Sequence, residues 1–316
     1  MRSKTKYDVS GEQVQAVFTE AGLGPVTKYE SLSDGWYNNV LAVTAGGADY
    51  VLKVAPLPQV AVLTHERGLM RQELRFYALL RERTTVRTPR VVWEDLSKTI
   101  IPCDYFIMEF LPGRRLDKAK LSKEEKARAD SDIRDILAQF HAIAAEGFGY
   151  EQMGLEENWH LALRKMTRAL VGDCARFGKR CRPGEKLLGY IEKHKALLES
   201  VPGALVNFDL HALNIFVHEG KLTIFDLERC FWGDRLGDFV YKVVPPKGLG
   251  KQEKIRFYLL MAYLAVIMHT EKYSRYSPRN AIWWMDVAGV AVFGTIGFAA
   301  LRRLSKNKGG RNAGPA

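Results

Sequence analysis

Two aspartates and an asparagine, Asp209, Asn214 and Asp226, flank a short hairpin pattern in the sequence. The pattern consists of two β-rich runs, residues 215–217 and 222–225, joined by a turn that contains a glycine. A hairpin holds its two ends side by side, so the residues before its first strand and after its second strand lie close together. The sequence therefore predicts a place where two carboxylates and a carboxamide converge.

These three side chains contain the groups that phosphoryl transfer to an alcohol requires. A hard cation such as Mg²⁺ takes oxygen ligands, usually one or two carboxylates together with the phosphates of a substrate. The reaction also needs a carboxylate that accepts the proton of the hydroxyl group and aligns its oxygen for attack. One carboxylate for the alcohol and an Asn/Asp pair for the metal would meet both requirements.

The order and spacing of these residues resemble the aminoglycoside phosphotransferase/choline kinase family, whose members are small-molecule relatives of protein kinases. The likeness rests on Asp209-Leu-His-x-x-Asn214-Ile, the hairpin and Ile-x-Asp226, followed by a Gly-Asp-x-x-x-Asp stretch that ends at Asp238. The resemblance implies that Asp209 is the catalytic base and that Asn214 and Asp226 bind Mg²⁺. It also implies that Asp238 braces the catalytic loop. The implied phosphoryl donor is ATP or GTP, and the implied acceptor is a small hydroxylated molecule.

A lysine in a predicted strand, Lys53, takes the place of the lysine that grips the nucleotide phosphates in this family. By itself, a lysine on a strand is more often an ordinary edge residue. Its carboxylate partner should come from the next helix, where Glu66 and Glu73 both have the right type and share a face. We prefer Glu73, because the stretch RQELRFYALL resembles the family's REAxxLRxL pattern.

Two further segments resemble parts of the family's nucleotide site. The turn Asp34-Gly35-Trp36-Tyr37-Asn38 resembles the turn that covers the phosphates, usually GGxSN, which implies contacts from Asp34, Gly35 and Asn38. The strand that ends at Glu109 resembles the hinge whose backbone holds the adenine. The first of these signals is weak, because one glycine in a polar turn is commonplace.

The likeness runs over residues 31–240, and it includes two departures from the family pattern. Asn207-Phe208 stands where the family has His-Gly, and Tyr37 stands where it has serine. Neither change removes a chemical group on which phosphoryl transfer depends. A non-catalytic pseudokinase or binding module of the same fold is the alternative, and the presence of Lys53 and Asp209 argues against it.

Secondary-structure patterns divide the chain into a strand-rich part, residues 1–110, and a helix-rich part, residues 111–316. Two β-rich runs around Gly46-Gly47 predict a hairpin, and a run of helix formers follows at residues 64–83. A capping box that begins at Ser122 opens the helical part. The prediction is an α+β, bilobal, protein-kinase-like fold, with a small antiparallel-sheet lobe carrying one helix and a larger, mostly helical lobe.

An apolar segment, residues 281–301, lies near the C-terminus and holds one charged residue, Asp286. Its length, its tryptophans at one end and its basic flank at the other fit a membrane span. A buried terminal helix that pairs with the apolar run at residues 255–268 explains it as well, and we favour that interpretation. The alternative is a membrane-associated kinase of a lipid-linked or envelope saccharide.

Composition restricts the function less than the motifs do. The chain has 316 residues and a net charge of +11, with basic runs at residues 174–195 and 301–316. Such runs attract polyanions in general, but no zinc finger or RNA-binding signature accompanies them, which argues against nucleic acid as the partner. The four cysteines fit no zinc-binding spacing, and the first residues lack the apolar core of a signal peptide. We expect a cytoplasmic protein, at the inner face of the membrane if the apolar segment is an anchor.

Overall fold

The computed structural model describes residues 3–32 and 37–306 of the chain, which packs into two compact units. We call the first the sheet unit; it comprises Met1–Val62, Glu66–Ile143 and Asp209–Cys230. We call the second the helical unit; it comprises Leu63–His65, Ala144–Phe208 and Phe231–Ala316. The lobe boundary expected between residues 110 and 111 stays a prediction. The predicted catalytic hairpin, which follows Asp209, packs as part of the sheet unit.

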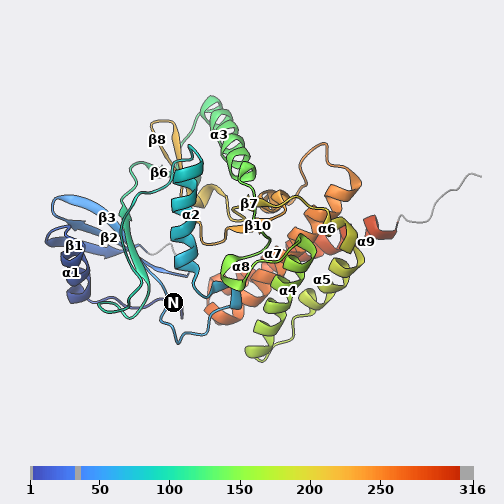
Figure 1. Cartoon of the computed structure of the whole chain (residues 1–316), viewed down its shortest axis with the longest axis horizontal. Coiled ribbons are helices and arrows are strands. Elements are labelled where there is room, and N and C mark those ends of the chain that lie inside the picture. The colour runs from blue at the N-terminus through green and yellow to red at the C-terminus, as the bar shows by residue number, and fades with distance from the viewer. Residues whose placement is uncertain (1–2, 33–36, 307–316) are drawn as a thin grey trace, which may run out of the picture. The chain divides into compact units, whose positions relative to one another are not determined.

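An antiparallel five-stranded sheet of order β1-β2-β3-β5-β4 forms the centre of the sheet unit (Figure 1). Its strands are β1 (Val26–Ser31), β2 (Asn39–Ala45), β3 (Ala48–Val54), β4 (Val91–Asp95) and β5 (Tyr105–Glu109). The predicted hairpin is confirmed as β2–β3, with φ values of 56° and 83° at Gly46 and Gly47, a left-handed turn that glycine adopts without strain.

The two faces of the sheet are covered by different helices. Leu52 and other alternate residues of the sheet pack with Val17 and Phe18 of α1 (Gly11–Glu20). On the other face, Phe106 contacts Tyr77 of α2 (Leu69–Arg83). Because successive strand residues point to opposite faces, Lys53 lies on the face away from the α1 core.

Helix α1 is an element that the sequence analysis does not predict. It begins with a capping box, in which the Gln13 N–H donates to Ser10 Oγ (3.2 Å) and the Gln13 side-chain oxygen accepts from the Ser10 N–H (3.0 Å). The predicted helix that follows Ser122 is present as α3 (Lys123–Ala142), with a capping box of the same kind. A cap of this type is therefore the sequence signal that could have revealed α1.

The predicted catalytic hairpin is confirmed as β8 (Ile215–His218) and β9 (Lys221–Ile224), with the short strand β6 (Arg114–Arg115) beside β8. Ile215 pairs with Ile224, and the Phe225 N–H donates to the Asn214 carbonyl at 3.1 Å. The backbone pairing therefore continues beyond the strands and holds the residues before β8 next to those after β9.

The helical unit is built around α7 (Lys251–Arg275), which is buried along most of its length. Around it pack α4 (Trp159–Arg176) and α5 (Arg182–Lys193), with the short helix α6 (Lys195–Glu199) beside α4. A two-stranded sheet of β7 (Ala204–Val206) and β10 (Phe231–Gly233) and a 3-10 helix, Arg235–Lys242, complete the unit.

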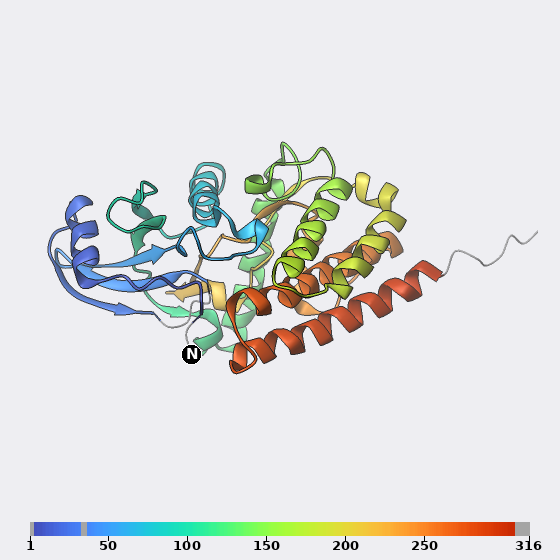
Figure 2. The ribbon, with the colours of Figure 1, turned by 90° about the horizontal axis from the view of Figure 1, so that it is seen from below.

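The C-terminal apolar segment forms one long helix, Ala281–Lys306, made of α8 (Ala281–Gly289), a π-helical turn and α9 (Thr295–Lys306) (Figure 2). It packs against α7, as predicted. The expected burial is only partial, because 28% of its most apolar window is buried. Its exposed large apolar side chains lie on one stripe at helical spacing: Trp284, Met285, Val292 and Ile296.

Candidate active site

A buried lysine lies at the centre of the site in the sheet unit. The Lys53 Nζ donates to both carboxylate oxygens of Glu73, at 2.9 and 2.7 Å, and to Asp226 Oδ1 at 2.7 Å. Glu73 comes from α2, which covers the sheet face that carries Lys53, so the predicted pairing with this residue is present. The other candidate, Glu66, lies before α2 and uses its backbone carbonyl to accept a hydrogen bond from Tyr37 (3.1 Å).

The carboxylates around Lys53 determine its protonation. Burial by itself lowers the pKa of a lysine, but Asp226, Glu73 and Glu228 outweigh this effect and hold the pKa of Lys53 well above its ordinary value. Burial raises the pKa of Glu73, and the Lys53 ammonium opposes that rise. The site therefore keeps one fixed positive charge among three carboxylates, away from water.

Tyr77 joins these groups, although the sequence analysis did not select it. Its hydroxyl donates to Glu73 Oε1 at 3.1 Å and accepts the backbone N–H of Asp226 at 3.1 Å. Tyr77 is one helical turn after Glu73 on α2, which is the only sequence signal that points to it. It fixes the backbone of Asp226, which has a positive φ of 63°.

Glu228 is a second residue that sequence reasoning missed. Its Oε2 lies 3.7 Å from Lys53 Nζ and accepts a hydrogen bond from Asn38 Nδ2 at 2.8 Å. Asn38, which was predicted to belong to the nucleotide site, is therefore connected to Lys53 by Glu228, which contacts both residues. Asp34 and Gly35, predicted to belong to the same turn, lie outside the described residues.

The predicted base, Asp209, is held by groups on either side of its carboxylate. Asn214 Nδ2 donates to Asp209 Oδ2 and to its backbone carbonyl, both at 3.1 Å. His211 Nε2 lies 3.4 Å from Oδ1, and Arg229 Nε lies 3.8 Å from Oδ2. Burial lowers the pKa of His211, but its hydrogen bond to Asp209 outweighs this and raises the pKa above the ordinary value.

Phe208, the departure from the family pattern, belongs to the core of the helical unit. Its φ is 60°, a conformation that glycine adopts freely and that a bulky residue adopts at a cost. The ring packs against Phe231 and Tyr263, with centroids 5.1 and 5.9 Å apart. The Phe208 N–H donates to Asp238 Oδ1 at 2.8 Å, so the aspartate braces the backbone just before Asp209.

The predicted hinge residue, Glu109, lies at the end of β5. Its backbone N–H donates to the Arg90 carbonyl (3.0 Å), and its carboxylate accepts from the Arg90 N–H (3.0 Å). The N–H of Glu109 is therefore already used within the sheet unit. A contact of this residue with an adenine stays a prediction.

The donor set fits a hard cation. Carboxylate oxygens of Glu73, Asp226 and Glu228 lie within 4.8 Å of one another. Asn214 uses its amide nitrogen toward Asp209, and its amide oxygen is chemically suited to a metal. Oxygen ligands of this kind are those that Mg²⁺ prefers.

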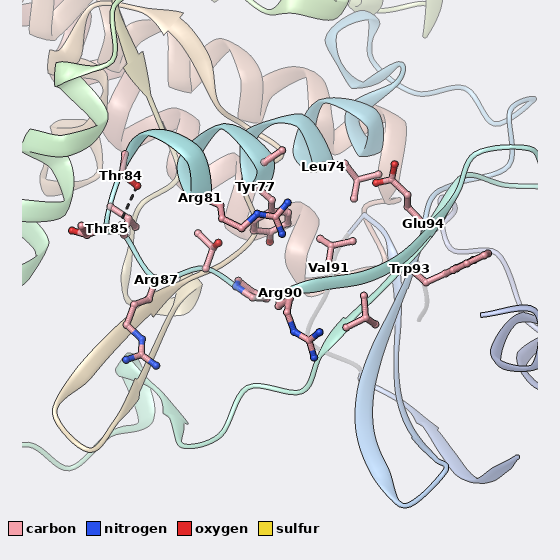
Figure 3. A pocket seen from close by; sticks show the side chains of 15 residues that line it. Leu74, Tyr77, Arg81, Thr84, Thr85, Arg87, Arg90, Val91, Trp93 and Glu94 are labelled. Atoms are coloured by element: carbon pink, nitrogen blue, oxygen red, sulfur yellow. Dashed lines mark hydrogen bonds between the residues drawn. The ribbon is translucent and has the colours of Figure 1, made fainter. Parts of the chain in front are cut away.

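A groove of about 840 Å³ lies elsewhere on the sheet unit, between α2, the segment at residues 84–90 and β4 (Figure 3). Arg81, Arg87 and Arg90 line it together with apolar residues such as Trp93. Of the residues at the centre of the site only Tyr77 lines this groove. The groove and the buried ion pairs therefore share one side chain, and Glu73, Asp226 and Glu228 do not line the groove.

Comparison of the sequence with known families gives one match, to the model described as "Phosphotransferase enzyme family", over residues 28–249. This range contains each of the site residues described above. No curated protein matches the sequence significantly.

Solved structures of similar fold cover nearly the whole chain. A candidate aminoglycoside phosphotransferase from Ralstonia eutropha JMP134 has a TM-score of 0.63 at 16% identity, covering 93% of this chain and 98% of its own. A candidate fructosamine-3-kinase from Haemophilus somnus 129PT has a TM-score of 0.60 at 14% identity, covering 92% and 97%. A thermostable mutant of aminoglycoside phosphotransferase APH(4)-Ia, in complex with AMP-PNP and hygromycin B, has a TM-score of 0.60 at 16% identity, covering 94% and 100%. At these identities the likeness confirms the predicted kinase-like α+β fold.

Tyr77→Phe should lower the free energy of unfolding by about 1–3 kcal/mol, because it leaves the Asp226 N–H and a Glu73 oxygen without this partner. Thermal or urea unfolding measures the change. Tyr29→Phe is the matched control, because Tyr29 is 44% exposed and its loss of a hydroxyl should change stability by less than about 0.5 kcal/mol. Equal effects of the two substitutions would contradict the role assigned to Tyr77.

Proposed function

Since the chain belongs to the Phosphotransferase enzyme family, we propose that it transfers the γ-phosphoryl group of ATP or GTP to a hydroxyl group of a small molecule. The observation that carries this proposal is the position of Lys53, whose ammonium is bonded to both Glu73 and Asp226. A buried lysine held by a helix glutamate, beside an aspartate that follows a hairpin, supplies the charges that a nucleotide's phosphates and metal require.

Each residue has a separate role in the proposed reaction. Lys53 binds the donor phosphates, and Glu73 holds its ammonium in place. Asp209 accepts the proton of the acceptor hydroxyl as the oxygen attacks the γ-phosphorus, and Asn214 orients its carboxylate through the 3.1 Å hydrogen bond. Catalysis then depends mainly on positioning and on charge neutralisation.

Asn214 and Asp226 would hold Mg²⁺ through oxygen atoms, and Glu228 adds a further oxygen that the sequence analysis did not include. When bound, the cation neutralises charge on the donor phosphates. The carboxylate of Asp226 is bonded to Lys53 in the structure, which keeps it next to the place where the phosphates would lie.

The surroundings of Asp209 favour an acceptor that is neutral or anionic. Arg229 and His211 both lie within 4 Å of its carboxylate, and both carry or can carry positive charge. A cationic aminoglycoside would meet these groups at the point of attack. Streptomycin and hygromycin B are the aminoglycosides in two of the solved complexes of similar fold.

A non-catalytic pseudokinase is the other candidate for the same fold. The geometry around Asp209 favours the enzyme, because a binding module has no need of a carboxylate oriented by Asn214 and flanked by Arg229. A thermal shift with Mg·ATP, followed by measurement of slow ATP hydrolysis, separates the two candidates. A shift without hydrolysis or transfer to any small hydroxylated compound would favour the pseudokinase.

We also propose that the long helix Ala281–Lys306 lies on a membrane surface, with the enzyme on the cytoplasmic side. Within the described residues it is the one helix long and apolar enough to cross a membrane, and its most apolar 18-residue window has a mean hydropathy of 1.6. Its contacts with α7 and its buried Asp286 favour a helix that stays in the fold and exposes one apolar stripe. Arg302, Arg303 and Lys306 are exposed at its end, as expected for a surface that meets anionic lipid.

Asp209→Ala should lower the rate of transfer by about 10²–10⁴-fold, because the acceptor loses its base. Nucleotide affinity, measured by calorimetry, should stay close to that of the unchanged protein, while Asp226→Ala should weaken the binding of Mg·ATP. The matched control is Asp135→Ala, an exposed aspartate on α3, which should change neither quantity. Normal turnover by Asp209→Ala would overturn the assignment of the base.

The activity should rise with pH through an inflection above the ordinary histidine pKa of about 6.5, because protonated His211 holds Asp209 and reduces its ability to accept a proton. The raised pKa also means that the His211–Asp209 pair stabilises the fold fully at low pH, and that this contribution is lost as pH rises through the raised pKa. His211→Gln should abolish the inflection and lower stability chiefly at acidic pH. Unchanged pH–rate profiles in His211→Gln would contradict this coupling.

The full chain should sediment with vesicles that contain anionic lipid and bind them less tightly at high salt. Trp284→Ser with Met285→Ser, or Arg302→Ser with Arg303→Ser, should each reduce the bound fraction. Leu155→Ser is the control, because Leu155 is also exposed (39%) but lies outside the helix. Absence of binding, or an equal loss with Leu155→Ser, would count against the membrane surface.

A further inference from the structure

A cluster of two thiols and an imidazole lies in the helical unit, apart from the site in the sheet unit. Cys174 comes from the last turns of α4, Cys181 precedes α5 and His269 lies on α7. Their ligand atoms, the two Sγ atoms and a ring nitrogen, all lie within 4.8 Å of one another. Both thiols are buried, with exposed fractions of 0% and 1%.

We propose that Cys174, Cys181 and His269 bind a thiophilic divalent cation, with Zn²⁺ as the best match. Thiolate sulfur and imidazole nitrogen are the ligands that Zn²⁺ prefers in proteins, at about 2.3 and 2.0–2.1 Å. In a tetrahedral site these lengths place neighbouring ligand atoms roughly 3.5–3.8 Å apart. The separations in the cluster lie within reach of this arrangement through small side-chain adjustments.

The imidazole is oriented for such a role. Its ring makes a hydrogen bond to the backbone of Arg180, the residue before Cys181. Its Nε2 is buried and has no hydrogen-bond partner among residues 3–32 and 37–306. A histidine that binds a metal commonly uses one ring nitrogen for the metal and gives the other to a backbone carbonyl or carboxylate.

The backbone between the two cysteines is held in a compact turn. The Cys174 carbonyl accepts the N–H groups of Phe177 (3.1 Å) and Lys179 (2.8 Å). The Cys181 carbonyl accepts the N–H of Glu185 (3.0 Å) at the start of α5. The fold therefore brings the two sulfur atoms within 4.8 Å of each other without a metal.

The charges near the cluster are compatible with a cation. Binding replaces the proton of each thiol by the metal, so two protons leave and the two thiolates balance the charge of the ion. The ammonium of Lys272 lies near both thiols, and it also faces the carboxylate of Asp286, which offsets its charge. The carboxylate of Asp173 next to Cys174 is bonded to Arg176 and to Thr64. A water molecule is suited to the fourth position.

The test uses the full-length, reduced and metal-free protein, titrated with Co²⁺ and then with Zn²⁺. We expect one equivalent of Co²⁺ to produce the thiolate-to-cobalt charge-transfer absorption, and Zn²⁺ to displace it. His269→Asn and Cys181→Ala should weaken binding by at least about 10–100-fold, since changes to outer partners alone have that effect. Zn²⁺ should also raise the unfolding temperature, because the three ligands come together in the folded chain.

Two controls separate this site from other ligands in the chain. Cys103→Ala removes a buried thiol of the sheet unit, and Asp226→Asn removes a carboxylate ligand of the proposed Mg²⁺ site; both variants should keep the charge-transfer band. A folded wild-type protein without the band would overturn the proposal, whatever the stability of the variants. So would a band that survives in both Cys181→Ala and His269→Asn, or one that is lost in Cys103→Ala.

Discussion

The buried ammonium of Lys53 is the interaction on which the candidate site depends. An isolated charge in a protein interior costs far more than folding can offset, so it must meet carboxylates with good geometry. The sheet supplies the lysine, α2 supplies Glu73, and the end of the β8–β9 hairpin supplies Asp226. Removing one partner of a buried pair typically costs about 3–5 kcal/mol. The same contacts that satisfy the charge therefore tie three separate segments of the sheet unit together.

Backbone conformation adds a second constraint, at Phe208 in the helical unit and at Asp226 in the sheet unit. Phe208 and Asp226 both have left-handed φ values, 60° and 63°, which only surrounding contacts can maintain in residues with a side chain. Asp238 accepts the Phe208 N–H, and Tyr77 accepts the Asp226 N–H. In each case, one buried side chain accepts the N–H of the residue that has the left-handed φ. A left-handed φ costs free energy in a residue other than glycine, and such residues are concentrated at functional sites.

Except for α1, the parts of the fold set by neighbouring residues could be predicted from the sequence. Contacts between distant residues could be predicted only where the family resemblance indicated them, as for Lys53 and Glu73. The β8–β9 hairpin and the capping box of α3 were predicted because their signals lie within a few residues. Glu228 and Tyr77 were missed because their roles depend on partners that are distant along the chain, which are Lys53 for Glu228 and Asp226 for Tyr77. For the helix Ala281–Lys306, composition alone could not distinguish burial on all sides from burial on one face, since that depends on packing against α7.

The two proposed cation sites differ in ligand chemistry, and this difference keeps them separate. Asp226 and Asn214 offer oxygen atoms, which suit Mg²⁺ bound together with phosphates. Cys174, Cys181 and His269 offer sulfur and nitrogen, which suit Zn²⁺ and bind Mg²⁺ poorly. The spacing of the cysteines in the sequence did not suggest a zinc site, because the third ligand comes from α7. Each unit can therefore bind its own cation without competing for that of the other.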